Sequence, residues 1–244
     1  MRRETAGVTE SLLQAAKEEF LTYGFHDASM RRISAACGVS TNSIYTRFGD
    51  KSGLFTAIVQ EAADGLMEMY VQSIQKATEC PDMDHAIKEG NEGTDQVLAY
   101  IYGYKEEFQL LFCHSAGTEY EDYFDKLAAI EEQYYNIFAK QYANENATAD
   151  EFFIHVFCRT GWQYIYEVLT HDKPYDEAAA FMKNVQIFNF AGWKAVFWIV
   201  NKMKHADACA GHQSYGLVTY DNRQCIAMCT AKKIKYRLVK TNFK

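Results

Sequence analysis

Proline is scarce in this chain, and so are the sequence patterns of β-strands. Only two prolines and 14 glycines occur in 244 residues, so few positions interrupt a helix. Before residue 215 there is almost no alternation of apolar and polar residues, the pattern typical of half-buried strands. These absences argue against a β protein and predict an all-α fold. The apolar content of 48% is ample for a packed core.

Other missing features indicate the cellular compartment in which we expect the protein. Seven cysteines at irregular spacings, an odd number, do not form a disulfide framework, which indicates a reducing compartment. The start of the chain lacks the apolar segment of a signal peptide. The longest apolar stretch, residues 185–200, is shorter than the about 20 residues of a transmembrane helix and contains polar side chains. We therefore expect a cytoplasmic protein that is not associated with a membrane.

The motifs of common enzyme classes are absent as well. The sequence has no glycine-rich phosphate loop, no HExxH zinc motif and no nucleophile elbow. His114 and Glu119 could form an acid–base pair, but a histidine at a helix end is more often a cap. Five residues have the chemistry of metal ligands in a spacing that matches no zinc pattern: His205, Cys209, His212, Cys225 and Cys229. We therefore expect no enzyme, no metal site and no cofactor.

One stretch near the N-terminus has the most specific pattern of the chain. Ser29 is suited to cap a short helix over residues 30–36, which Gly38 ends because glycine adopts a left-handed backbone at little cost. Ser40 is suited to cap a second helix over residues 41–48, which is mostly polar. This arrangement predicts a helix-turn-helix whose second helix enters the major groove of DNA. An ordinary αα-corner is the alternative.

Short motifs surround this stretch: Tyr23-Gly24-Phe25, Ser29, Ile33-Ser34-Ala35-Ala36, Gly38-Val39-Ser40, Ile44-Tyr45, Phe48, Lys51 and Leu54-Phe55. Together they resemble the TetR (tetracycline-repressor-like) family of bacterial transcription regulators over roughly residues 9–59. Asn42 and Arg47 depart from the family pattern, which more usually has a small residue or proline and an aromatic residue or histidine there. The resemblance implies a DNA-binding homodimer with a small-molecule pocket.

Nine residues are candidates for contacts with operator DNA. Four are predicted to reach base edges: Arg31, Thr41, Asn42 and Ser43. Five are predicted to contact phosphates: Ser29, Arg32, Tyr45, Arg47 and Lys51. Lys51 is doubly suited to this role because it stands at the start of a helix.

Charge is distributed unevenly along the chain. Residues 1–58 carry seven Lys and Arg against six Asp and Glu, residues 59–204 carry eleven against 24, and residues 205–244 carry seven against two. A nearly neutral head can still bind phosphates through basic groups on one surface, and an acidic middle limits binding to arbitrary DNA.

The remainder of the chain predicts a helical body. We expect helices at about residues 51–78, 83–103, 105–114, 119–142, 150–171 and 175–204, with capping boxes at Thr118 to Glu121 and Thr148 to Glu151. The last two helices are apolar on all faces, which predicts that a partner chain covers them in a four-helix homodimer interface.

Three domains follow from these patterns. Residues 1–58 form the predicted DNA-binding domain, and residues 59–204 the predicted ligand-binding and dimerisation domain. Residues 205–244 are a basic tail with three candidate strands, whose order the sequence leaves open. The helix over residues 51–78 is expected to be the only continuous element that touches both head and body.

The middle of the chain is rich in aromatic residues. Aromatic side chains with few polar groups line small-molecule sites, and the resemblance implies such a pocket. The candidates are Tyr104, Phe108, Phe112, His114, Tyr134, Phe138, Trp162 and Tyr166. The competing interpretation is that each is simply a core residue.

The sequence thus predicts a ligand-responsive transcription regulator, a repressor released from a palindromic operator by a small hydrophobic or aromatic inducer. The alternative is a helix-turn-helix regulator without a small-molecule ligand, controlled by a protein partner through its aromatic surface.

Overall fold

The computed structural model describes residues 6–142, 150–194 and residue 196. Over these residues every regular element is a helix, so the all-α prediction is confirmed. The elements are α1 (Ala6–Asp27), α2 (Met30–Cys37), α3 (Thr41–Phe48), α4 (Lys51–Thr78), α5 (Met83–Gly103), α6 (Lys105–Cys113), α7 (Tyr123–Tyr142), α8 (Glu151–Thr170) and α9 (Tyr175–Lys194). The strands predicted for the C-terminal tail lie outside the described residues.

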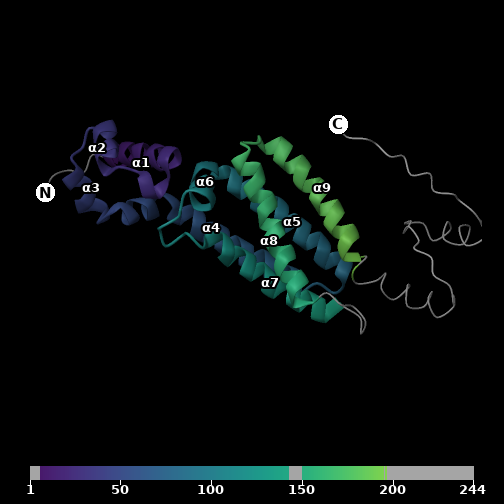
Figure 1. Cartoon of the computed structure of the whole chain (residues 1–244). Coiled ribbons are helices and arrows are strands. Elements are labelled where there is room, and N and C mark those ends of the chain that lie inside the picture. Colours follow the sequence, from purple (N-terminus) through teal and green to yellow (C-terminus); the bar gives the residue numbers. More distant parts are fainter. Residues whose placement is uncertain (1–5, 143–149, 195, 197–244) are drawn as a thin grey trace, which may run out of the picture. The chain divides into compact units, whose positions relative to one another are not determined.

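The first three helices form a head, and α4 runs from it into a body made of α5 to α9 (Figure 1). Side-chain caps start the short helices of the head. Ser29 Oγ accepts a hydrogen bond from Arg32 N at 3.5 Å, and Ser40 Oγ accepts one from Ser43 N at 3.1 Å. Between them Gly38 closes the turn with a φ of 68°, a conformation that favours glycine.

The junction of α3 and α4 is unusually tight. A Cβ added to Gly53 would lie 2.0 Å from the carbonyl oxygen of Phe48, so only glycine lets α4 begin this close to the end of α3. A core of fully buried apolar side chains fixes the four helices against one another: Leu12, Phe20, Ile33, Ile44, Leu54 and Phe55.

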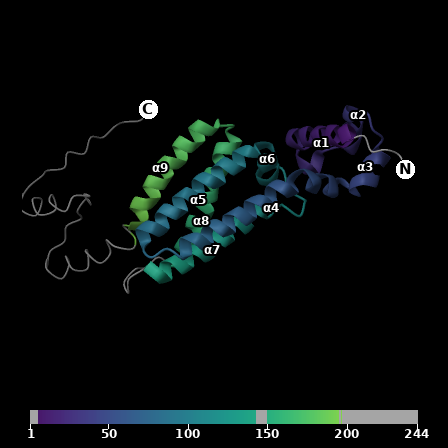
Figure 2. The same cartoon turned by 180° about the vertical axis from the view of Figure 1, so that it is seen from behind.

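In the body, α4 and α5 lie side by side (Figure 2). Two glycines permit this close approach. A Cβ on Gly65 would lie 2.1 Å from the Tyr100 hydroxyl oxygen, and one on Gly93 would lie 2.0 Å from Ser73 Oγ. Each glycine therefore makes room on one helix for a side chain of the other, Tyr100 of α5 or Ser73 of α4.

The start of α7 differs from the prediction. Thr118 Oγ1 accepts a hydrogen bond from Tyr120 N at 3.1 Å and donates one to Ser115 O at 2.7 Å, so its hydroxyl stabilises a turn. The predicted capping box from Thr118 to Glu121 is therefore wrong, and the helix begins at Tyr123. At α8 the observed cap is Asp150, and the predicted cap Thr148 lies outside the described residues.

Within the described part of the chain, no helix is long and apolar enough to cross a membrane. Among the same residues, no three His, Cys, Asp or Glu side chains are grouped so that they could hold a metal ion. The five candidate ligands between His205 and Cys229 lie outside the described residues.

Candidate functional site

The outer face of α3 is accessible at Asn42, Tyr45 and Thr46. Ile44 is fully buried and fixes the orientation of the helix. Asn42 and Tyr45 are therefore exposed on the opposite face, with 48% of Tyr45 accessible. Thr41 and Ser43 are partly buried at its edge. A short helix that is anchored by a buried residue on one face and exposes polar side chains on the other has the geometry of a recognition helix, which enters the major groove of DNA.

The two arginines of α2 have different surroundings. Arg31 is exposed. The guanidinium of Arg32 donates to Glu19 Oε1 at 2.8 Å and to Asp27 O at 2.9 Å, and it lies 4.2 Å from the centre of the Tyr23 ring. Arg32 thus ties α2 to α1, whereas Arg31 is available to a ligand of the head.

Three other predicted phosphate contacts also take part in the packing of the head. Lys51 Nζ donates to the carbonyl oxygens of His26 at 3.0 Å and Ala28 at 3.2 Å. An ammonium has three donors, so one remains for an anion. Arg47 Nη1 donates to Thr9 Oγ1 at 2.8 Å, and Ser29 N donates to Glu19 Oε1 at 2.8 Å. Arg47 thus ties α3 to α1, while Lys51 and Ser29 join other parts of the head, whatever the three contribute to phosphate binding.

Contacts of α6 join the head to the body independently of α4. Phe25 N donates to His114 O at 3.1 Å, and Lys17 Nζ lies 2.7 Å from Glu107 Oε1 and 3.0 Å from Glu106 Oε2. The expectation that the helix over residues 51–78 alone touches both is therefore wrong.

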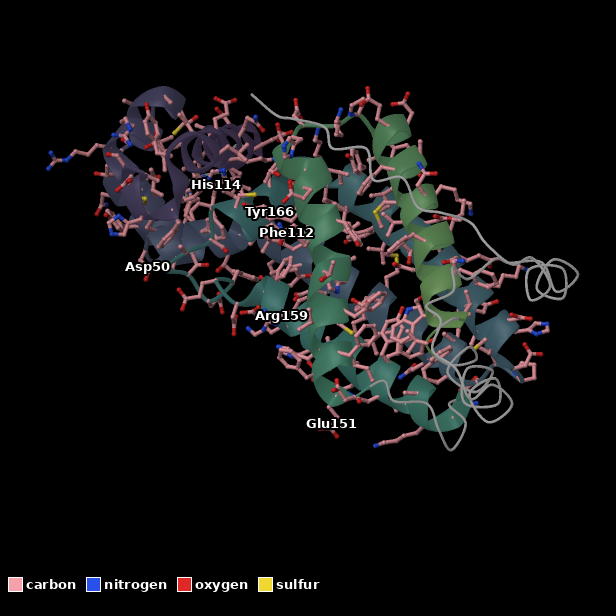
Figure 3. All side chains as sticks on the ribbon, turned by 45° about the vertical axis from the view of Figure 1, so that its right-hand side comes forward. Asp50, Phe112, His114, Glu151, Arg159 and Tyr166 are labelled. Carbon is pink, nitrogen blue, oxygen red and sulfur yellow. The ribbon has the colours of Figure 1, made fainter. Side chains whose placement is uncertain are left out.

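Figure 3 shows where α6 ends, with His114 nearest the head and Phe112 farther into the body. Burial lowers the pKa of the His114 imidazole, which favours the neutral ring at pH 7. The side chain therefore brings no positive charge to the junction. The hydrogen bond that His114 makes there comes from its backbone carbonyl oxygen, which accepts from Phe25 N.

The body contains a cavity of about 150 Å³ between α4, α5, α7, α8 and α9. Its walls are mainly aromatic and aliphatic, and they include Tyr70, Val97, Tyr134, Tyr135, Phe138, Trp162, Ile165 and Trp193. The Tyr70 and Trp162 rings meet edge to face at 5.1 Å, and the Tyr135 and Trp193 rings stack at 4.8 Å. The cavity is large enough for an aromatic ring, because a cavity of similar volume is known to hold benzene.

One carboxyl group, that of Glu131, lies among the apolar side chains of the described lining residues. Burial raises the pKa of Glu131 to about 8, and the nearby Tyr70 hydroxyl and Trp162 indole offset this only partly. Among the described residues that line the cavity, none is a lysine, arginine or histidine. Glu131 is therefore mostly neutral at pH 7. No basic side chain of the described lining residues is present to pair with its ionised form.

Comparison with known proteins identifies a family that the head resembles in sequence. The sequence profile described as "Bacterial regulatory proteins, tetR family" matches residues 12–58. Residues 12–58 therefore have the sequence of a TetR-family head. The TetR family is one of transcription regulators and not of enzymes, and the match confirms the resemblance seen in the sequence.

Two similar HTH-type transcription regulators each match about a quarter of this chain. The transcriptional repressor AcnR of Corynebacterium glutamicum is 35% identical over 60 residues, which are 25% of this chain and 32% of AcnR. The transcriptional activator FasR of Mycolicibacterium smegmatis is 35% identical over 68 residues, 28% of this chain and 31% of FasR. The chain thus matches about a third of the length of these relatives.

The fold beyond the head is also that of a solved TetR-family structure. NalD, described as the secondary repressor of the MexAB-OprM multidrug efflux pump in Pseudomonas aeruginosa, superposes with a TM-score of 0.51 at 15% identity. The likeness covers 74% of this chain and 95% of NalD. At this identity it shows a common fold and nothing about the ligand.

The cavity contains some of the residues predicted to bind a ligand. Tyr134, Phe138 and Trp162 line it. The other five lie elsewhere: Tyr104 with its hydroxyl 3.2 Å from Glu61, Phe108 fully buried in the core, Phe112 packed on Phe108, His114 at the head, and Tyr166 beside Cys113.

The sequence prediction also missed residues of the cavity, above all Glu131. A signal for it was present, because Leu127, Glu131 and Tyr135 recur at four-residue spacing and so share one face of α7. A charged residue in the middle of an apolar helical stripe indicates a buried polar site.

Proposed function

We propose that the protein is a DNA-binding transcription regulator that acts as a homodimer and changes its operator affinity when a small molecule fills the body cavity. The single observation that carries this proposal is the outer face of α3, where Asn42 and Tyr45 are exposed within a head of the TetR family. The head would span residues 1–58, and the ligand-binding and dimerisation body residues 59–204.

The apolar surface of α8 and α9 supports the homodimer. Phe152 is 74% exposed, Phe188 71% and Ile187 62%. The Phe153 and Trp193 rings meet at 5.8 Å, so the start of α8 lies beside the end of α9. Large exposed apolar side chains on adjacent helices mark an association surface. A second copy related by a two-fold axis covers the surface of both chains at once.

Repression is the direction that we propose for the regulation. Both directions occur among the relatives, since AcnR is named a repressor and FasR an activator. A ligand changes DNA binding only through different affinities for two states, and a coupling of about 1 to 3 kcal/mol changes operator affinity roughly 5- to 150-fold. The cavity between the helices of the body supports a small molecule as that ligand.

Footprinting on DNA fragments selected from the organism's genome tests the proposal. We expect protection of two half-sites in a pseudo-palindrome, because two recognition helices related by a two-fold axis read both. Asn42→Ala should change the base preference, with a loss of about 1 to 3 kcal/mol on the preferred site only.

Thr46→Ala, on the same exposed face, is the matched control, since its hydroxyl is already bonded to Asn42 O at 2.8 Å. Protection of one asymmetric half-site by a monomer, or an equal loss on every sequence for Asn42→Ala, would contradict the proposal.

A further inference from the structure

The described residues that line the cavity of the body supply one carboxyl group, no basic side chain and many aromatic rings. The Glu131 carboxyl lies over a glycine of α8, because a Cβ built on Gly161 would be 3.5 and 3.6 Å from its two oxygens. The glycine therefore leaves the carboxyl uncovered by a side chain on that side. Glu131 is thus available to a molecule in the cavity that it lines.

A polar atom of a second lining residue lacks a partner among the described residues. The amide oxygen of Asn189 is buried without a hydrogen bond. Buried polar atoms are nearly always paired in folded proteins, and an unpaired one is costly. An unpaired acceptor next to the same cavity indicates a ligand that carries a hydrogen-bond donor.

The aromatic walls add a preference for charge. The faces of Tyr and Trp rings are negative and attract cations within about 6 Å of the ring centre. Tyr70, Tyr134, Tyr135, Trp162 and Trp193 all line the cavity. An anionic ligand would meet these rings and Glu131 with no basic group among the described lining residues to balance it, whereas a cation would be attracted by the carboxylate and by any ring face that it reaches.

We propose that the cavity binds a monovalent organic cation, an ammonium group carried on an aromatic or apolar body. The ammonium lies against the Glu131 carboxylate and the aromatic faces, and the apolar part fills the space between α5 and α9. This inference rests on the proposed function, because it names the chemical class of the inducer of the same regulator.

An isosteric pair of probes tests this directly. Phenyltrimethylammonium and tert-butylbenzene have the same shape and differ in charge. Titration calorimetry at pH 8.5 should show at least tenfold tighter binding of the cation. Its charge does not change with pH, so its affinity should rise roughly tenfold from pH 6.5 to 8.5 as Glu131 ionises, while the affinity of the neutral probe stays constant.

Variants assign the effect to one side chain. Glu131→Gln should weaken binding of phenyltrimethylammonium at least tenfold at pH 8.5 and abolish its pH dependence. Glu132→Gln is the matched control on the next position of α7, where the carboxyl lies 2.9 Å from His155 Nδ1 and does not line the cavity. It should bind the cation as the parent does.

Each outcome decides the inference. Equal affinities for the two probes, an unchanged affinity in Glu131→Gln, or no binding of the cation would overturn it. Footprinting of the ligand-free protein is measured in parallel and depends on the head alone. A protein that protects DNA but prefers tert-butylbenzene would refute the cation and leave the proposed function intact. One that binds the cation but no DNA would refute the regulator.

Discussion

At the scale of single residues, Glu131 should make stability depend on pH. Its pKa is raised to about 8 in the folded chain by burial, whereas an unfolded chain would ionise it near the ordinary value of 4.5. Below the ordinary value both states are protonated and the residue costs nothing. Between the two values the folded state holds the extra proton, so stability falls as the pH rises.

We therefore predict that Glu131→Gln stabilises the protein at alkaline pH. The gain over the parent should be near zero at pH 4.5 and should grow by at most about 1.4 kcal/mol per pH unit up to pH 8. Urea unfolding at pH 5, 7 and 8.5 measures it, with Glu132→Gln as the control. A gain that is the same at all three pH values would mean that the carboxyl is not buried in the folded state.

The residues of the cavity show where prediction from sequence reaches its limit. Trp162 and Phe108 are both aromatic residues on helices, yet one lines the cavity and the other is sealed in the core. Whether an aromatic residue lines the cavity or fills the core depends on how the neighbouring helices pack. The spacing of apolar residues along its own helix does not show this. Glu131 was predictable in principle from its position on an apolar stripe, but not the absence of a basic partner around it.

At the scale of elements, most helices follow from local signals. The ranges predicted for residues 41–48, 51–78 and 83–103 agree with α3, α4 and α5, because each begins after a Ser or Asp that caps it. The start of α7 was missed because Thr118 has two ways to satisfy its hydroxyl. The contact between α1 and α6 was also missed, since it involves segments about 90 residues apart and no local motif announces it.

The ion pairs of Lys17 provide a test of that contact. The two hydrogen bonds to Glu107 and Glu106 outweigh burial and raise the pKa of Lys17. Lys17→Met leaves Glu107 partly buried and unpaired, so it should destabilise α1 by about 1 to 2 kcal/mol. Hydrogen exchange should become faster in α1 and remain unchanged in α8.

The matched control removes a surface pair of the same kind. Lys126 and Asp122 are each 53% exposed and lie one helical turn apart on the body. Lys126→Met should change stability by less than about 0.5 kcal/mol. Equal effects of the two substitutions would show that the Lys17 pairs do not hold head and body together.

At the scale of the whole molecule, the exposed surface of α8 and α9 should determine the association state. Phe188→Asp introduces a charge at a position that is 71% exposed within one chain, so the fold of the chain should tolerate it. In a dimer the same charge would be buried without a partner. We predict at least a tenfold weaker dimer by sedimentation velocity, together with unchanged helical content by circular dichroism.

Ile137→Asp serves as the control for this experiment. Ile137 is 51% exposed but belongs to α7, outside the proposed dimer surface. Its substitution should leave the association state unchanged. If Phe188→Asp remains as dimeric as the parent, the proposed surface is not the interface.

The bond between Phe25 N and His114 O has a consequence for how such a protein diverges. It joins two backbone groups, so no side chain specifies it, and every residue except proline at position 25 retains the donor. Under the proposed function, substitutions in the head that change the operator, or in the body that change the inducer, retain this backbone bond. The two specificities can then change separately while this connection between head and body is kept.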